Sequence, residues 1–475
     1  MIHNDENLET TAEFGKTRSN FNNPVPELSL QEIFSLRSRL QRYLEVEAAL
    51  ALTQADLGII PQSAGDKIAR ASKLEWIDEK RLAAEQANTG HFMMPLVSEL
   101  SRVVGEPEGG YVHWGATTQN IEQTGDVMGI RSAVHILTNQ LCDVLEALAN
   151  LGEKTADTLM AGRTHWQQAV PITFGFKVAT WADVLLRHLE RLEQVKPRLF
   201  TSMTGGAAGT FASLGDKGPA IQEGVARRLN LTPMAVPARN IVDQFAEYVL
   251  LLGMIAATLT SIAEEVARLM AIEFGEVSES LPDGDVGSST MPQKRNAKKC
   301  NEVVTKSARI RAMVPTALEA MIQSHEVDGT RSAMMQHAVE QSSILTSDIL
   351  KAIHNVLVGL EIYPERMKMN LALSGGLINA EAVMMTLAKM IGRQTAHEVL
   401  HDTAHQVARS GAELTFFDVL SKDSRVSEHL SSAEIKKLLD PAAHIGLSTE
   451  IAKETSSRAY AAVSLYRQQI KTCKF

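Results

Sequence analysis

LGMIAATLTSIAEEVARL, residues 252–269, decides the fold class of this 475-residue chain. The large aliphatic residues of this stretch recur at alternating spacings of three and four, which is typical of a long helix packed at a shallow angle against others. The positions are Leu252, Ile255, Leu259, Ile262, Val266 and Leu269. Flanking residues are apolar too, so we expect burial on all sides. The stretch therefore predicts the centre of a multi-helix bundle, which we expect to be shared between subunits; the interior of a monomer is the alternative.

The rest of the chain also favours long helices. No proline lies within 108–170, 238–281 or 316–363, and such gaps permit uninterrupted helices. Alternating apolar and polar runs, which are typical of half-buried strands, are nearly absent. The predicted fold class is therefore all-α, with helices expected over 131–160, 173–195 and 303–323, the last of them broken at Pro315.

The length of the chain is too great for one compact core, so several domains are expected. We predict a three-domain subunit whose long central helices form a bundle. The predicted parts are a mobile tail (1–23), an N-terminal helical domain (24–118), a central bundle domain (119–368) and a C-terminal helical domain (369–475).

Composition excludes several classes of partner and site. The formal net charge of −9 gives no reason to expect nucleic acid or an anionic membrane surface as a partner. Three distant cysteines, Cys142, Cys300 and Cys473, make a disulfide framework or a zinc site unexpected and favour a reducing cytoplasm. The polar start of the chain does not resemble a signal peptide, and no membrane-spanning run of apolar residues is found.

The first candidate segment is HWGATTQN, residues 113–120, directly before an expected helix. Short hydrogen-bonding side chains and the free N–H groups of a helix N-terminus suit a carboxylate or a phosphate. A helix cap followed by a turn is the simpler alternative, and this segment alone does not decide between them.

The second candidate is GRTHWQQ, residues 162–168, which we interpret as a loop. His165 lies between an arginine and two glutamines, which could fix its tautomer for general acid–base work. A structural histidine is the alternative.

The third candidate is the loop DVGSSTMPQKRN, residues 285–296. Three hydroxyls, two cations and an amide in so short a segment are suited to an anion, whereas a solvated surface loop is the alternative. The next helix begins with Lys298 and Lys299, and cations oppose the dipole of a helix N-terminus. A purely stabilising role therefore explains this loop poorly.

Residues 287–296, GSSTMPQKRN, resemble the signature of the fumarase/aspartase superfamily at every fixed position. The first two segments are similar to the superfamily's two other motifs, and they occur in the same order. GGAAGT at 205–210 and GRQTAHEVL at 392–400 match as well, so the resemblance extends from about Leu28 to the C-terminus. It is strongest to the branch of 3-carboxy-cis,cis-muconate cycloisomerase and adenylosuccinate lyase, and MAGRTHWQQAVPITFG at 160–175 is especially like the cycloisomerase.

This resemblance implies an all-helical homotetramer in which three subunits contribute to each active site. It also implies an elimination from a succinate-like di- or tricarboxylate that uses no metal or organic cofactor. Ser288 matches the base and His165 the general acid. The predicted substrate-binding residues are Lys294, Asn296, Thr117, Thr118, Gln119, Asn120, Gln167, His91 and His113, with Arg331 added because it lies near positions where relatives carry arginine.

Several positions depart from the pattern of the superfamily. Asn120 and Gln123 stand where Asp is usual, and Ala297 stands where Pro is usual. Arginines that relatives carry near Asp243 and Glu326 are replaced here by Val242, Gln244 and Val327. We therefore expect β-elimination, by C–N or C–O cleavage, from a less charged substituted succinate. The alternatives are the lactonising cycloisomerase, adenylosuccinate lyase and a non-catalytic homologue like the lens crystallins.

Overall fold

The computed structural model describes residues 28–280, 290–291, 293–410 and 413–472, with side chains up to residue 468. The predicted tail 1–23 and the predicted base Ser288 lie outside these residues. The helices are α1 (Leu30–Ile33), α2 (Leu36–Asp56), α3 (Gln62–Ala71), α4 (Glu79–Thr89), α5 (Met93–Val104), α6 (Thr118–Lys154), α7 (Phe174–Leu199), α8 (Gly218–Arg228), α9 (Asp243–Met270), α10 (Lys298–Ala320), α11 (Gly329–Val358), α12 (Pro364–Ala372), α13 (Ala380–Ile391), α14 (Arg393–Arg409), α15 (Phe416–Lys422), α16 (Ser424–Ser427), α17 (Ser432–Leu438) and α18 (Ser448–Thr472).

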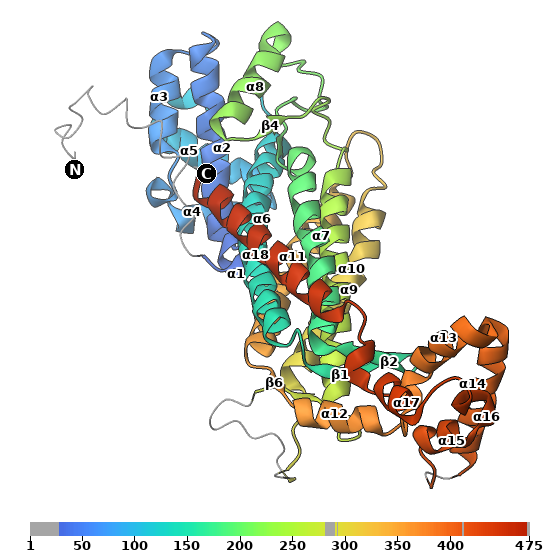
Figure 1. The fold of residues 1–475 in the computed structure, drawn as a ribbon. Helices are drawn as coiled ribbons and strands as arrows, with labels where there is room; N and C mark the ends of the chain where they lie inside the picture. The colour runs from blue at the N-terminus through green and yellow to red at the C-terminus, as the bar shows by residue number, and fades with distance from the viewer. Residues whose placement is uncertain (1–27, 281–289, 292, 411–412, 473–475) are drawn as a thin grey trace.

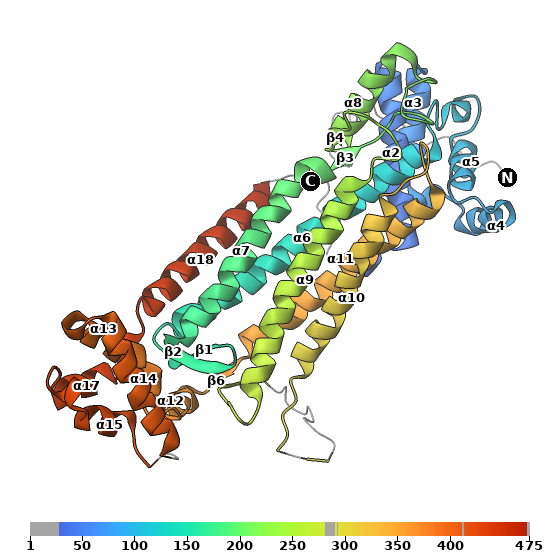
Figure 2. The ribbon, with the colours of Figure 1, turned by 90° about the vertical axis from the view of Figure 1, so that its right-hand side faces the viewer.

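The long helices α6, α7, α9, α10 and α11 run side by side and form the body of the molecule (Figure 2). The short N-terminal helices gather at one end of this bundle, whereas α12 to α17 lie at the opposite end (Figure 1). The helices from α13 to α17 have a separate apolar core that includes Val383, Leu400 and Phe416. Helix α18 leaves that group and packs along α6 and α7. The all-α class is confirmed, and the domain boundaries stay a prediction.

The six apolar residues that recur along α9 at spacings of three and four, from Leu252 to Leu269, are buried as expected. None of them is more than 3% exposed. Met254, on the same helix, is nevertheless 45% exposed, so one chain does not bury α9 on all sides. Helix α9 is also long and apolar enough to cross a membrane, but 61% of its most apolar window is buried among other helices. It is thus the central helix of the bundle with one side uncovered.

Two predicted helices have other limits than expected. The helix predicted over 131–160 ends at Lys154, because hydrogen bonds from Phe174 N–H to Thr158 and from Gly175 N–H to Thr155 tie the following turn to the start of α7. The break predicted at Pro315 was wrong, since α10 runs through it. A proline removes one backbone hydrogen bond, and the packing of α10 against α9 and α11 maintains the helix.

The described residues contain three small two-stranded sheets. Strands β1 (Leu159–Thr164) and β2 (Gln167–Thr173) form an antiparallel hairpin, so the interpretation of 162–168 as a loop was wrong. The pairs β3 (Thr201–Ser202) with β4 (Thr232–Pro233) and β5 (Val277–Ser278) with β6 (Glu361–Ile362) are short. The hairpin and β5–β6 lie at the end of the bundle from which α12 departs (Figure 1).

Candidate active site

The N-terminus of α6 is fixed by a buried amide. Asn120 is 1% exposed, and its Oδ1 accepts hydrogen bonds from the backbone N–H groups of Thr117 (3.2 Å) and Gly206 (3.0 Å). These bonds hold the start of the helix against the glycine-rich segment 205–209. Thr117 and Thr118 are half-buried beside it. Asn120 therefore positions these residues, and a direct contact of Asn120 with a substrate stays a prediction.

His113 is anchored in the same region by a buried carboxylate. Its Nδ1 lies 2.5 Å from Oε1 of Glu47, a residue that is 1% exposed. Burial lowers the pKa of His113, but the charge of Glu47 and the hydrogen bond to it outweigh burial, so the net shift is upward. The backbone of His113 has a φ of 62°, in the left-handed region. The pairing with Glu47 thus fixes the imidazole close to the start of α6.

A cavity of about 480 Å³ adjoins this helix start. Gln119 is the predicted site residue that lines it, and Arg239, which the sequence analysis missed, lines it as well. Arg239 Nε donates a hydrogen bond to Gln119 Oε1, and its Nη1 donates one to the backbone oxygen of Ala207 (3.0 Å). Val242, at a position where relatives carry arginine, is also part of the lining. No sequence pattern around Arg239 indicated this role.

The charged lining of the cavity comprises two arginines and three carboxyl groups: Arg39, Arg239, Glu122, Asp126 and Glu340. Arg39 pairs with Glu340 and lies 3.5 Å from Asp126. Burial raises the pKa of each of the three carboxyl groups above its usual value. Both arginines therefore have partners or neighbouring carboxyl groups within the cavity wall.

Two other predicted residues lie near this cavity. His91, which precedes the cavity residue Phe92, caps α5: its Nδ1 accepts hydrogen bonds from the N–H groups of Met93 and Met94, both at 3.2 Å. This arrangement leaves Nε2 as the nitrogen that carries the hydrogen. Arg331, on the first turn of α11, donates to Glu319 Oε1 at 2.5 Å. We call this part of the molecule, with residues 113–120 and the cavity, the α6 end.

The opposite end of the bundle presents His165 at the tip of the β1–β2 hairpin. His165 and Trp166 form its two-residue turn, with φ values of 50° and 68°. Two positive φ angles are typical of the type I′ turn, which matches the twist of hairpin strands. Trp166 is 81% exposed, and the guanidinium of Arg268 lies 5.6 Å from its ring centre. His165 and Gln167 are exposed as well.

A buried ion pair supports this hairpin. Arg163, two residues before His165, donates to both carboxylate oxygens of Glu276 at 3.0 and 2.6 Å, and Glu276 is fully buried. Asn370 donates to the same carboxylate at 2.7 Å, and its backbone oxygen accepts from Gln168 (2.7 Å). The base of the hairpin is thus fixed, whereas its tip faces outward.

The described part of the third segment lies at the same end. Lys294 is exposed and Asn296 is half-buried, directly before α10. The carboxylate of Glu279 accepts from the N–H groups of Lys299 (3.2 Å) and Cys300 (2.8 Å), which explains how a helix can begin with two lysines. We call the hairpin together with residues 290–291 and 293–298 the hairpin end.

One chain does not bring the predicted residues into one site. The α6 and hairpin ends lie at opposite ends of the long bundle (Figures 1 and 2). Helix α6 alone has 37 residues, which is roughly 55 Å at 1.5 Å per residue. His113, Thr117, Thr118, Gln119 and Asn120 are brought together at one end, and His165, Gln167, Lys294 and Asn296 at the other.

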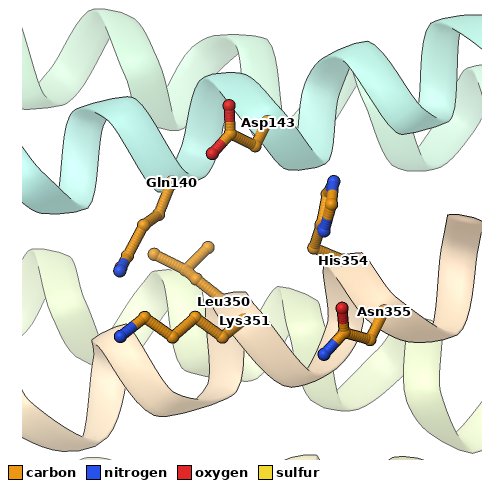
Figure 3. Close-up of a pocket in the computed structure, with 6 residues that line it drawn as sticks. All are labelled: Gln140, Asp143, Leu350, Lys351, His354 and Asn355. Atoms are coloured by element: carbon orange, nitrogen blue, oxygen red, sulfur yellow. The ribbon is translucent and has the colours of Figure 1, made fainter.

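A second cavity, of about 200 Å³, lies between α6 and α11 (Figure 3). Gln140 and Asp143 enter it from α6, and Lys351, His354 and Asn355 from the facing helix. Gln140 Nε2 donates to Ser347 Oγ at 2.9 Å, and Asp143 pairs with Arg467. None of the predicted site residues that the structure describes lines this cavity.

Comparison with known proteins agrees with this architecture. Residues 20–312 match the family model described as lyase, and residues 376–455 match the model of the adenylosuccinate lyase C-terminus. The chain is 38% identical over 424 residues to the 3-carboxy-cis,cis-muconate cycloisomerase of Pseudomonas aeruginosa, covering 88% of this chain and 91% of that protein. It is 35% identical over 421 residues to the N-acetyl-S-(2-succino)cysteine lyase of Enterococcus italicus, covering 89% and 92%.

A solved structure is similar along almost its whole length. The fumarate lyase from Mesorhizobium sp. superposes with a TM-score of 0.84 at 34% identity, covering 91% of this chain and all of that one. The match to the lyase family extends over more than half of the chain, and the relatives cover nearly all of it. This chain therefore belongs to the fumarase/aspartase superfamily of lyases, in the branch that includes adenylosuccinate lyase and carboxymuconate cycloisomerase.

Proposed function

We propose that this enzyme removes the substituent from a substituted succinate by β-elimination and releases fumarate or a closely related unsaturated acid. The observation that carries the proposal is the α6 end. There a helix N-terminus, two threonines and the imidazole anchored by Glu47 precede Gln119, which lines a cavity large enough for a substituent. A helix N-terminus with hydroxyl groups suits the carboxylate of a succinate.

The proposed chemistry begins with the removal of a proton from the carbon beside a carboxylate, which is weakly acidic. The electron pair left on carbon delocalises into that carboxylate, so a second negative charge develops there and must be stabilised. Ser288 would act as the base, with Lys294 and Asn296 stabilising the intermediate. The bond to the substituent then breaks, its electrons leave with the substituent, and His165 would supply a proton to it.

We further propose that each site combines the α6 end of one copy with the hairpin ends of other copies in a homotetramer. Separation of the two ends within one chain supports this arrangement. So does the surface of the bundle, where Met254 on α9 and Trp166 on the hairpin are uncovered. Large apolar side chains exposed in this way are common where subunits meet.

The charge of the cavity restricts the substituent. Both arginines of its described lining already have partners, Glu340 for Arg39 and Gln119 for Arg239, and Val242 offers no charge. A phosphate would require an unmatched cation, so we propose a substituent that carries no phosphate and is linked through nitrogen, oxygen or sulfur. The lyase of Enterococcus italicus is named for a succinyl thioether, which is a substrate of this kind.

The test is a panel of N-, O- and S-substituted succinates, adenylosuccinate among them, scored for release of fumarate. We expect turnover of at least one phosphate-free member. Replacing the proposed acid and base, by His165→Asn and Ser288→Ala, should lower turnover by roughly 10²- to 10⁴-fold each. His354→Asn, in the second cavity, is the matched control and should retain activity. Wild-type turnover by both site variants would end the proposal.

A second candidate is lactone formation by a carboxymuconate cycloisomerase. The hairpin sequence at 160–175 and the relative from Pseudomonas aeruginosa favour it. Incubation with 3-carboxy-cis,cis-muconate distinguishes the two candidates, because consumption of this compound without release of fumarate would identify the cycloisomerase. No consumption would exclude it.

A further inference from the structure

Three histidines line one exposed face of α14, in the C-terminal group of helices, which lies at the same end of the bundle as the hairpin (Figure 1). His397, His401 and His405 follow one another at intervals of four residues, so they lie above one another on the helix. All three are exposed. Neither the proposed elimination nor the apolar core formed by this helix uses their imidazoles.

The imidazoles of His401 and His405 approach each other through their Nε2 atoms. Nε2 of His405 lies 3.2 Å from Nε2 of His401, whereas the two ring centres are 4.4 Å apart. The two nitrogens are thus closer to each other than the two ring centres are. One shared hydrogen could join them in the metal-free protein.

We propose that His401 and His405 together chelate a divalent transition-metal ion such as zinc, nickel or copper. With metal–nitrogen bonds of 2.0–2.1 Å, two nitrogens 3.2 Å apart subtend an angle of roughly 100° to 106° at the metal. This angle lies between the octahedral and tetrahedral values, so both imidazoles can bind with little movement. Imidazole is a preferred ligand for these ions.

A carboxylate beside the pair fits the surroundings of a metal-binding imidazole. Oδ1 of Asp402 lies 3.9 Å from Nδ1 of His401, the nitrogen that would not bind the metal. The other oxygen of Asp402 accepts from Arg425 at 3.0 Å, which holds the carboxylate in place. The separation of 3.9 Å exceeds hydrogen-bond distance, so Asp402 contributes a nearby negative charge and does not hold the imidazole.

The site takes two ligands from this chain, and water would complete the coordination. The ring of His397 stacks on that of His401, with centres 6.4 Å apart and planes 23° apart, instead of converging with the pair. Within the described ranges, no group of three or more His, Cys, Asp and Glu side chains is arranged to hold a metal. We therefore expect moderate affinity for one ion per chain.

Calorimetric titration of the untagged full-length protein with zinc chloride and with nickel chloride tests the proposal. At about pH 7.5 we expect one ion per chain, and an excess of a chelator should remove it. The variants His401→Ala and His405→Ala should each lose the binding signal. His397→Ala, and His429→Ala at another exposed histidine, should retain it.

Asp402→Asn provides a graded test, since loss of this nearby negative charge should weaken metal binding less than loss of either histidine. The altered side chains are exposed, so circular dichroism should show the fold unchanged in every variant. Unchanged binding in the His401→Ala/His405→Ala double variant, or no binding by the wild-type protein at about pH 7.5, would overturn the proposal. The elimination assay is independent of both outcomes.

Discussion

The two ends of the helical bundle differ in how far one chain completes them. At the α6 end, polar groups are buried and already paired: Asn120 holds Thr117, and Glu47 holds His113. At the hairpin end only the base is fixed, by Arg163 and Glu276, while His165 faces outward. The α6 end is thus a preformed surface for binding. The hairpin end instead exposes the side chain of His165, as a residue that acts on a site in another molecule would be exposed.

This difference suggests a division of labour between copies of the chain. A preformed binding surface needs no partner to keep its shape. An exposed imidazole supplies little catalysis until it reaches a dry, organised environment, which strengthens charge stabilisation. Bringing the hairpin end of one copy onto the α6 end of another would provide that environment.

Complementation between inactive variants would give the largest effect. His165→Asn disables the hairpin end, and a Thr117→Ala/Thr118→Ala double variant disables the α6 end. Each alone should be nearly inactive. Co-expression should restore about a quarter of wild-type activity, because random assortment of chains in a symmetric oligomer reunites two intact ends in about one site in four.

Two controls accompany this experiment. Each variant co-expressed with itself should remain inactive, and the mixed oligomer should have the same size as the wild-type protein. If both ends of a single chain served the same site, assortment could never reunite two intact ends. Mixed proteins without activity would therefore contradict the proposed assembly.

The buried ion pair between Arg163 and Glu276 should contribute strongly to the stability of the hairpin. Glu276→Ala leaves the guanidinium of Arg163 partly buried without its partner, which we expect to lower the free energy of unfolding by about 3–5 kcal/mol. Thermal unfolding and hydrogen exchange of residues 159–173 would measure the effect. Glu264→Ala is the matched control, since its carboxylate pairs with Arg268 at the surface and should contribute under about 1 kcal/mol. Equal effects of the two substitutions would refute the role of the buried pair.

The amide that shapes the α6 end should give a smaller effect. Asn120→Ala removes the acceptor for two backbone N–H groups, and leaving such groups unsatisfied costs about 1–3 kcal/mol. Asn120→Asp retains the acceptor oxygen and restores the residue usual in the superfamily, so it should unfold near the wild-type denaturant concentration. An alanine variant as stable as wild type would show that Asn120 does not hold this helix start.

Sequence reasoning predicted the parts of the fold that depend on local pattern. The seam of α9 follows from helical spacing, and the start of α7 follows Thr173, whose hydroxyl accepts from the N–H of Phe176 (3.2 Å). The hairpin was missed because its turn residues, His165 and Trp166, are not the Asn-Gly type that usually indicates a type I′ turn.

Only those residues of the candidate site that belong to a sequence motif could be predicted. The contact between Arg239 and Gln119 joins residues 120 positions apart, and no local spacing encodes such a contact. The separation of the two ends follows from the length of α6, whose N-terminus lies at one motif and whose C-terminus leads to the next. Motifs adjacent in the sequence can therefore lie at opposite ends of a bundle when one long helix joins them.

The smallest expected effect concerns the pH dependence of the α6 end. Since the pKa of His113 is raised in the folded chain, the stability gained from its pairing with Glu47 is fully present below the unfolded pKa of histidine, about 6.5. It is lost as the pH rises through the higher pKa of the folded state. Glu47→Gln removes the charge that sustains this shift, so the stability difference between wild type and variant should be larger at about pH 5.5 than at about pH 9. Denaturant unfolding at both pH values measures this difference in the free energy of unfolding.

The control is Glu75→Gln, at an exposed acid, which should show no such pH dependence. A stability difference between wild type and Glu47→Gln that grows with pH would contradict the raised pKa of His113.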